Sequence, residues 1–134
     1  MPKKTFHHVG LRAFEPQPDE DYVAPSDCWV THPKKSLHRI EYLRYGENSP
    51  ISEEFRNAPH VAYTVDNLDE HIAGKEVYVG PFDVGYDPPF ARVVFTKEDG
   101  LFVEYMQFYP GRTWFTEDDE AAANDSKEPS GARR

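Results

Sequence analysis

The sequence predicts an α+β fold built from two copies of one strand-rich module. Residues 59–108 show apolar and polar patterns in the order strand, helix, strand, strand, strand. Residues 6–45 contain a shorter version of the same arrangement. The aromatic content of 14% and the 12 prolines favour strands over long helices. We therefore expect one domain with an internal repeat.

Length and composition limit the organisation of the chain. Its 134 residues suffice for one domain with a buried core. We expect this domain at residues 1–115, with modules at about 5–50 and 58–110. Residues 116–134 are acidic and almost lack bulky apolar side chains, which predicts a disordered tail.

Charge and cysteine content narrow the partners and the compartment. A net charge of −9 argues against nucleic acid as a partner. No apolar run is long enough for a membrane span, and the basic N-terminus lacks the apolar segment of a signal peptide. Cys28 is the sole cysteine, so no internal disulfide is expected. These features predict a cytoplasmic protein without a membrane partner.

The second half gives the clearer sequence of elements. A strand at 59–65 leads into a helix that Asp66 or Asn67 caps and Gly74 ends. Further strands are expected at 76–79, 90–96 and 101–108. Gly80 and Pro81 predict a turn, and residues 85–89 a loop that covers a pocket.

The first half repeats this pattern with a reduced helix. Strands are expected at 6–12, 28–31 and 37–45. Prolines leave room for only about one helical turn near residues 19–22. A connector at 51–58 holds one further helical turn, which Ser52 caps.

Each half carries one histidine in its first strand and one glutamate in its last. The pairs are His8 with Glu41, and His60 with Glu104. His8 is preferred to His7 because a small residue follows two positions later on the same face, as Ala62 follows His60. Glu104 lies in an aromatic-rich strand, where an inward carboxylate needs a partner. Of the remaining histidines, His32 is expected in a loop, His38 on the opposite face and His71 on the helix surface.

Three stretches resemble one known superfamily. His-Val-Gly-Leu at residues 8–11, the strand-to-helix segment 59–69 and the closing hairpin 99–107 are similar to the vicinal oxygen chelate superfamily. Its members include glyoxalase I, methylmalonyl-CoA epimerase, extradiol dioxygenases and fosfomycin-resistance enzymes. The resemblance implies a pair of βαβββ modules, the first one shortened here, whose mixed sheet forms an open cup around a metal site.

The resemblance also implies a cofactor and its ligands. The matching positions are His8, Glu41, His60 and Glu104, which would hold one divalent ion. Two imidazoles and two carboxylates suit Ni, Co, Zn, Mn or Fe. A homodimer is common in this superfamily and is possible for this chain.

The ligand pattern is most similar to that of glyoxalase I, which implies a metal-dependent isomerase, epimerase or lyase. The substrate would be a small hydroxy-carbonyl compound that reacts through a metal-stabilised enediolate, with Glu104 or Glu41 as the base. The chain has no clear match for the elements that hold glutathione, which argues against a glutathione-bound substrate. The short first module also predicts a wider cup mouth, compatible with a sugar-like or other polar substrate. The expected substrate contacts are Arg39, Tyr45, Arg92, Phe102 and Met106.

Two other classes of function remain open at this point. An Fe(II)-dependent ring-cleaving dioxygenase would use only one of the two glutamates as a ligand. A non-catalytic, resistance-type binding protein would need no metal and would use an aromatic-lined cup that includes Phe90. Metal content and oxygen uptake distinguish the three.

Overall fold

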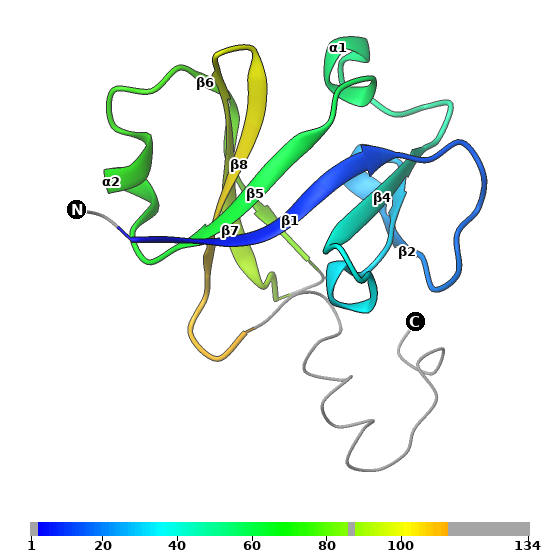
Figure 1. The fold of residues 1–134 in the computed structure, drawn as a ribbon, viewed down its shortest axis with the longest axis horizontal. Helices are drawn as coiled ribbons and strands as arrows, with labels where there is room; N and C mark the ends of the chain where they lie inside the picture. The colour runs from blue at the N-terminus through cyan, green and yellow to red at the C-terminus, as the bar shows by residue number, and fades with distance from the viewer. Residues whose placement is uncertain (1–2, 86–87, 113–134) are drawn as a thin grey trace.

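The computed structural model describes residues 3–85 and 88–112 (Figure 1). The tail expected at residues 116–134 lies outside the described residues. Among the residues that the structure describes, no helix combines the length and apolar character needed to cross a membrane.

Each half of the chain contributes four strands to one sheet. The first half supplies β1 (Lys4–Arg12), β2 (Asp21–Val23), β3 (Cys28–Val30) and β4 (Ile40–Tyr45). The second half supplies β5 (His60–Val65), β6 (Val77–Val84), β7 (Ala91–Glu98) and β8 (Leu101–Phe108). Within the described residues their order is β2-β3-β4-β1-β5-β8-β7-β6. The sheet is mixed and curls into an open, cup-like half-barrel, as the sequence predicted.

The internal repeat is visible in the strand pairing. β1 pairs with β4 in parallel, and β5 pairs with β8 in the same way. The two halves join through the antiparallel pair β1 and β5, which run side by side through the middle of the molecule (Figure 1). Each half therefore has its first strand at the centre and its second strand at an outer edge.

The helices are few and short. α1 (Glu53–Arg56) begins after Ser52, whose hydroxyl accepts a hydrogen bond from the Phe55 amide as predicted. α2 (Leu68–Ile72) begins after Asn67, whose side chain caps the Glu70 amide. Two 3₁₀ turns, η1 (Ala24–Ser26) and η2 (Pro33–Lys35), lie in the first half.

The helical turn expected near residues 19–22 is wrong. The chain instead enters β2 at Asp21 and pairs with β3 as an edge strand. Asp21 is buried, and its carboxylate lies 2.6 Å from Nε2 of His32, which is also buried. This ion pair holds β2 against the segment that follows β3, so a polar residue stabilises a strand where the prolines had favoured a loop or turn.

Two further boundaries differ from the prediction. β4 begins at Ile40 rather than residue 37, because Arg39 has a left-handed backbone with φ of 59°. β6 continues through Gly80 and Pro81 instead of turning there. The pairing with β7 shifts between Val79 and Phe82, and an edge strand tolerates a proline that lacks an N–H donor.

Two apolar clusters fill the two faces of the second half. One contains Ala62, Phe90, Ala91, Val93 and Met106. The other packs beneath α2 and contains Val65, Leu68, Val94, Val103 and Tyr105. Helix α2 covers the outer face, which leaves the inner face of the curled sheet for the site.

Candidate metal centre

Strand register places the four predicted residues in two adjacent rows. Glu41 on β4 lies opposite Gly10 on β1, and Gly10 lies opposite His60 on β5. His8 lies opposite Ala62, which in turn lies opposite Glu104 on β8. Directly paired residues point to the same face of a sheet, so all four side chains converge. Each row has a small residue at its centre.

The small residues make room for the histidines. A Cβ atom added at Gly10 would lie 2.0 Å from Cε1 of His60, so the imidazole occupies the space beside the glycine. Ala62 is fully buried between His8 and Glu104. The spacing of a histidine and a small residue two positions later therefore has a packing reason in both halves.

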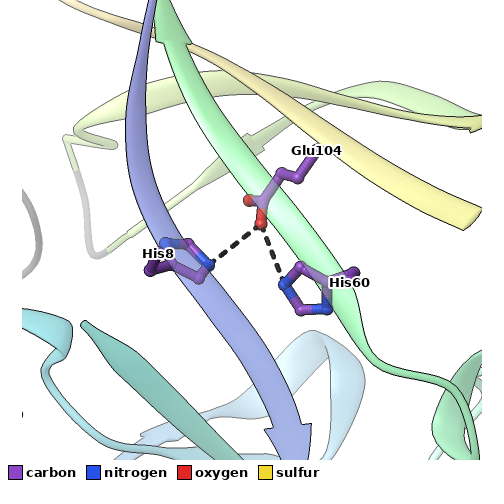
Figure 2. Close-up of side chains that lie close together, drawn as sticks. All are labelled: His8, His60 and Glu104. Carbon is purple, nitrogen blue, oxygen red and sulfur yellow. Dashed lines mark ion pairs between the residues drawn. The ribbon is translucent and has the colours of Figure 1, made fainter. Parts of the chain in front are cut away.

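Three of the four side chains form a compact group. His8, His60 and Glu104 each offer one ligand atom, and these atoms lie within 4.8 Å of one another. Oε1 of Glu104 is 3.3 Å from Nε2 of His8 and 3.2 Å from Nε2 of His60 (Figure 2). All three residues are buried. Such a geometry brings two imidazole nitrogens and a carboxylate oxygen toward one point.

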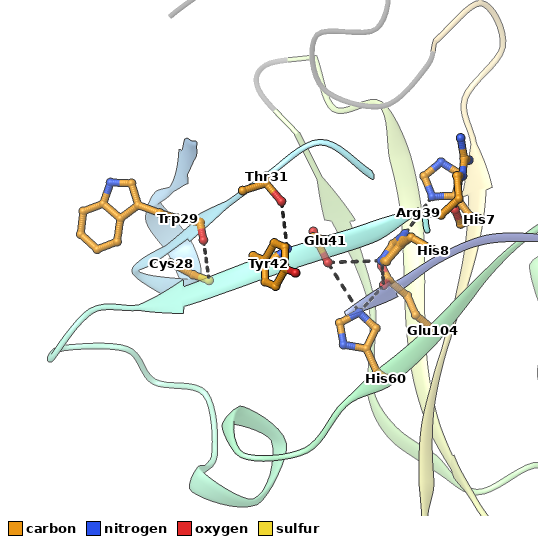
Figure 3. A network of polar contacts seen from close by, with 10 residues as sticks. All are labelled: His7, His8, Cys28, Trp29, Thr31, Arg39, Glu41, Tyr42, His60 and Glu104. Carbon is orange, nitrogen blue, oxygen red and sulfur yellow. Dashed lines mark hydrogen bonds and ion pairs between the residues drawn. The ribbon is translucent and has the colours of Figure 1, made fainter. Parts of the chain in front are cut away.

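Glu41 stands beside this group without belonging to it. Its Oε1 lies 3.2 Å from Nε2 of His8 and 3.6 Å from Nε2 of His60 (Figure 3). The side chain is buried, as is Glu104. The two carboxylates thus approach the same two imidazole nitrogens from different strands.

Electrostatics couple the four residues. Burial alone would lower the pKa of His8, but Glu41 and Glu104 raise it to about 10. The pKa of His60 is also raised, because the same carboxylates outweigh its burial. Burial would raise the pKa of Glu41 and Glu104, yet the two histidines hold both below their usual range. Two buried carboxylates in this position need positive charge, from protons on the imidazoles or from a cation.

His7 contacts the ring nitrogen of His8 that does not face the carboxylates. Its Nδ1 lies 2.8 Å from Nδ1 of His8, and its carbonyl oxygen accepts a hydrogen bond of 2.9 Å from Nε of Arg39 (Figure 3). A register shift in β1 between Phe6 and His8 accompanies this arrangement. Burial lowers the pKa of His7 to about 4, with the charge of His8 adding to the effect, so His7 is neutral at neutral pH. The sequence offered His7 only as a rival to His8, and the structure gives it a supporting position.

A cavity of about 480 Å³ opens onto the centre. Glu41, His60 and Glu104 form part of its wall. Phe55 on α1 stacks on His60 with ring centroids 5.5 Å apart, and Phe95 meets the same imidazole edge-on at 5.4 Å. Sequence reasoning missed both phenylalanines, although an isolated aromatic residue in the polar connector 51–58 was a usable signal.

Comparisons with known proteins find similarity only at the level of structure. Methylmalonyl-CoA epimerase from Mycobacterium tuberculosis superimposes with a TM-score of 0.54 and 16% identity, over 79% of this chain and 89% of that one. A mutant of 4-hydroxymandelate synthase from Streptomyces coelicolor gives a TM-score of 0.50 and 14% identity, over 93% of this chain and 55% of that one. No family model matches the sequence, and no curated protein matches it significantly.

Both solved structures come from the vicinal oxygen chelate superfamily. This chain has the vicinal oxygen chelate fold. The fold that the sequence resemblance predicted is therefore confirmed. The chain spans about half (55%) of the synthase structure, which is longer than this protein.

The residues that were expected to contact the substrate do not all lie around the cavity. Tyr45 lies in the cavity wall, as does Phe90, which was expected in a binding cup. Arg39 instead binds the His7 carbonyl. Arg92 lies 3.6 Å from Asp69 of α2. Phe102 packs against Phe55 and Tyr78, and Met106 lies in the apolar cluster with Ala62.

The other histidines lie away from the centre. His32 pairs with Asp21, and His38 is exposed in the turn before β4. His71 is buried rather than on the helix surface, because its Nε2 lies 3.0 Å from the carbonyl oxygen of Lys3. None of these three belongs to the compact group.

The donor set of the centre fits a divalent ion. Nε2 of His60 is buried and makes no hydrogen bond within the described residues, although Oε1 of Glu104 lies 3.2 Å away. Imidazole nitrogens with carboxylate oxygens are typical ligands of borderline divalent metals. Two neutral imidazoles and two carboxylates carry a charge that one divalent cation balances.

Proposed function

We propose that this protein is a divalent-metal-dependent enzyme that acts on a hydroxy-carbonyl substrate through an enediolate. The reaction is an isomerisation, an epimerisation or a β-elimination. The observation that carries the proposal is the buried convergence of His8, His60 and Glu104, whose ligand atoms lie within 4.8 Å of one another. His60 and Glu104 also line a cavity. A bound divalent ion would supply Lewis-acid polarisation of two adjacent substrate oxygens.

We assign the proton transfer to Glu41. Glu104 belongs to the compact group and would be committed to holding the ion, whereas Glu41 lies outside that group and still borders the cavity. The histidines lower the pKa of Glu41 in the metal-free centre, which keeps its carboxylate ionised. An ionised carboxylate in the cavity wall can accept the proton from the substrate carbon next to the carbonyl. Return of that proton to either face of the carbon gives an epimer. Its delivery to the former carbonyl carbon, with the hydroxyl proton passing to the former carbonyl oxygen, gives an isomer. Departure of a group with its electron pair from the β-carbon gives the elimination product.

The histidines and the aromatic wall serve this step indirectly. His8 and His60 would hold the ion in a fixed position, because each side chain projects from a central strand. Phe55 and Phe95 exclude water from the side of His60, which strengthens electrostatic interactions at the centre.

Exchange of the substrate's α-hydrogen with solvent tests this proposal. In deuterium oxide, the metal-loaded protein should incorporate deuterium at the α-carbon of a hydroxyketone, as followed by proton NMR. Glu41→Gln should retain the ion and lose about 10²- to 10⁴-fold in exchange rate, whereas Glu104→Gln should lose the ion. Undiminished exchange in Glu41→Gln would remove the assigned base.

A second candidate function is supported by one specific observation. The compact group consists of two histidines and one carboxylate, which is the ligand set of non-haem Fe(II) oxygenases. In that case Glu41 would be neither a ligand nor the base, and activity would require Fe(II) and dioxygen. Oxygen consumption by the Fe(II)-loaded protein with a catechol, and none with the Ni- or Co-loaded protein, would favour this candidate.

A further inference from the structure

The cavity beside the metal centre has an unusual distribution of charge. Among the described residues that line it, none is lysine or arginine. The charged side chains in its wall are Glu41 and Glu104 of the centre and Asp83, which is exposed and accepts a hydrogen bond of 2.5 Å from the Tyr109 hydroxyl. The positive charge of the centre, on its imidazoles or on a bound ion, is matched by Glu41 and Glu104. An anionic ligand would therefore find no further positive side chain among the described residues of the wall.

The guanidinium groups of Arg12 and Arg56 lie near enough to Tyr45, in the cavity wall, for their charge to lower the pKa of its phenol. Both groups have hydrogen-bond partners elsewhere. Arg12 donates to Oδ1 of Asn57 at 2.5 Å and lies over the ring of Phe14. Arg56 donates to the carbonyl oxygen of Ile51. Recruiting either group to a ligand carboxylate would break these contacts, so neither is a ready anion site.

Most of the wall is apolar. Branched aliphatic side chains come from both halves of the sheet, and aromatic rings come from α1, β6, β7 and the segment before β7. The residues are Val23, Val30, Leu43, Ile51, Phe55, Val79, Phe82, Val84, Phe90 and Phe95. Phe55 and Phe95 lie edge-to-face with centroids 4.8 Å apart, and Phe82 stacks on Phe95. Flat rings of a ligand would find matching aromatic surfaces here.

Apart from His60 of the centre, the remaining polar groups of the wall are neutral. Burial raises the pKa of the Tyr45 phenol and of the Cys28 thiol well above their usual values, so both stay protonated. Cys28 lies opposite Tyr45 in the pairing of β3 with β4. Together with Ser26 they offer only a few donors and acceptors in the wall, too few to pair the many hydroxyls of a sugar.

We propose that the substrate is an uncharged, predominantly apolar compound, with an aromatic body and a single pair of adjacent oxygens that faces the metal centre. This inference rests on the proposed function for the role of the oxygen pair, and it replaces the sugar-like substrate expected from the sequence. A cavity of about 480 Å³ falls within the range that encloses small organic ligands. The apolar wall supplies the binding free energy, and the centre fixes the orientation.

Paired ligands test the charge preference. Benzoin is a neutral aromatic α-hydroxyketone, and its ring-carboxylated derivative adds one negative charge. Equilibrium dialysis against the metal-loaded protein should show the carboxylate binding about tenfold or more weakly, because its charge has no partner in the cavity. Equal or tighter binding of the carboxylate would overturn the inference.

A matched pair of variants tests whether the preference for a neutral ligand arises in this cavity. Val79 lines the cavity and is 46% exposed, while Val77 on the same strand is 43% exposed and lies outside the lining. Val79→Lys should reduce or reverse the preference for neutral benzoin, and Val77→Lys should leave it unchanged. An identical response of the two variants would place the ligand elsewhere.

The same experiment separates this inference from the proposed function. Dialysis with metal-free protein reports on the apolar wall alone, and the preference for the neutral ligand should persist there. Loss of all metal binding with that preference intact would contradict the proposed function only. Metal binding combined with a preference for the carboxylate would contradict only the substrate class.

Discussion

At the scale of single residues, two consecutive histidines have different positions relative to the centre. His8 directs Nε2 toward the carboxylates, while its Nδ1 contacts Nδ1 of His7 at 2.8 Å. Only one of these two Nδ1 atoms can carry the shared proton. When Nε2 of His8 binds a cation, the His8 proton must lie on Nδ1, so His7 must accept it. His7 is therefore expected to fix the tautomer of His8.

Substitution of His7 tests this positioning role. His7→Phe removes the acceptor and should weaken metal affinity by about 10- to 100-fold. His7→Asn keeps an acceptor near the position of Nδ1 and should bind metal with nearly the affinity of the unmodified protein. Competitive titration against a chromophoric chelator measures both. Unchanged affinity in His7→Phe, with its fold retained by circular dichroism, would contradict the role.

At the scale of elements, the pairing of β1 with β5 decides whether the centre forms. His60 fits because the residue opposite it, Gly10, has no side chain. A glycine here serves close packing, since the added Cβ would overlap the imidazole. The site is thus a property of strand register as much as of its ligands.

Gly10→Ala should therefore disturb both stability and metal binding. The clash with His60 should cost about 1–3 kcal/mol of unfolding free energy, as overpacking does elsewhere. Adding His60→Ala removes the opposing ring, so the double variant should recover stability relative to Gly10→Ala while still failing to bind metal. Urea denaturation of the three variants measures the coupling, and strictly additive effects would argue against the contact.

The elements also show what the sequence can predict. β8 and the caps at Ser52 and Asn67 follow from local alternation and capping residues, and the structure has them where predicted. Repeated order and spacing also identified four residues that the structure brings together. β2 was missed because its stability comes from the buried contact between Asp21 and His32, which local patterns do not encode. Of the expected substrate contacts, Tyr45 lines the cavity, whereas a residue such as Met106 is directed by long-range pairing into the core.

At the scale of the whole molecule, the centre joins the two halves of the chain. His8 and Glu41 come from the first half, and His60 and Glu104 from the second. An ion bound by ligands from both halves would stabilise the native protein relative to the unfolded chain, in which those ligands are far apart. Metal binding and folding should therefore be linked.

This linkage predicts opposite pH responses for metal-free and metal-loaded protein. In the metal-free protein the raised pKa of His8 contributes stability that is full below pH 6.5 and is lost as the pH rises toward about 10. The lowered pKa values of Glu41 and Glu104 contribute stability above pH 4.5 that is lost in more acidic solution. The metal-free protein should thus lose unfolding free energy between pH 6.5 and about 10, as measured by urea denaturation with a chelator.

The metal-loaded protein should not follow that decline. The ion requires neutral imidazoles, so its affinity increases as protons leave His8 and His60. A His8→Gln variant, which lacks the titrating group, provides the metal-free control and should show a flatter profile. Parallel profiles for the metal-free and metal-loaded proteins would argue against a shared site for protons and metal.

Metal content tests the central claim most directly. Elemental analysis of untagged protein, before and after reconstitution with Ni, Co, Zn, Mn or Fe(II), should find about one ion per chain. The His60→Ala/Glu104→Ala variant should find almost none under the same conditions. Equal metal content in both proteins, or no metal in the unmodified protein after reconstitution, would contradict a metal centre at His8, His60 and Glu104.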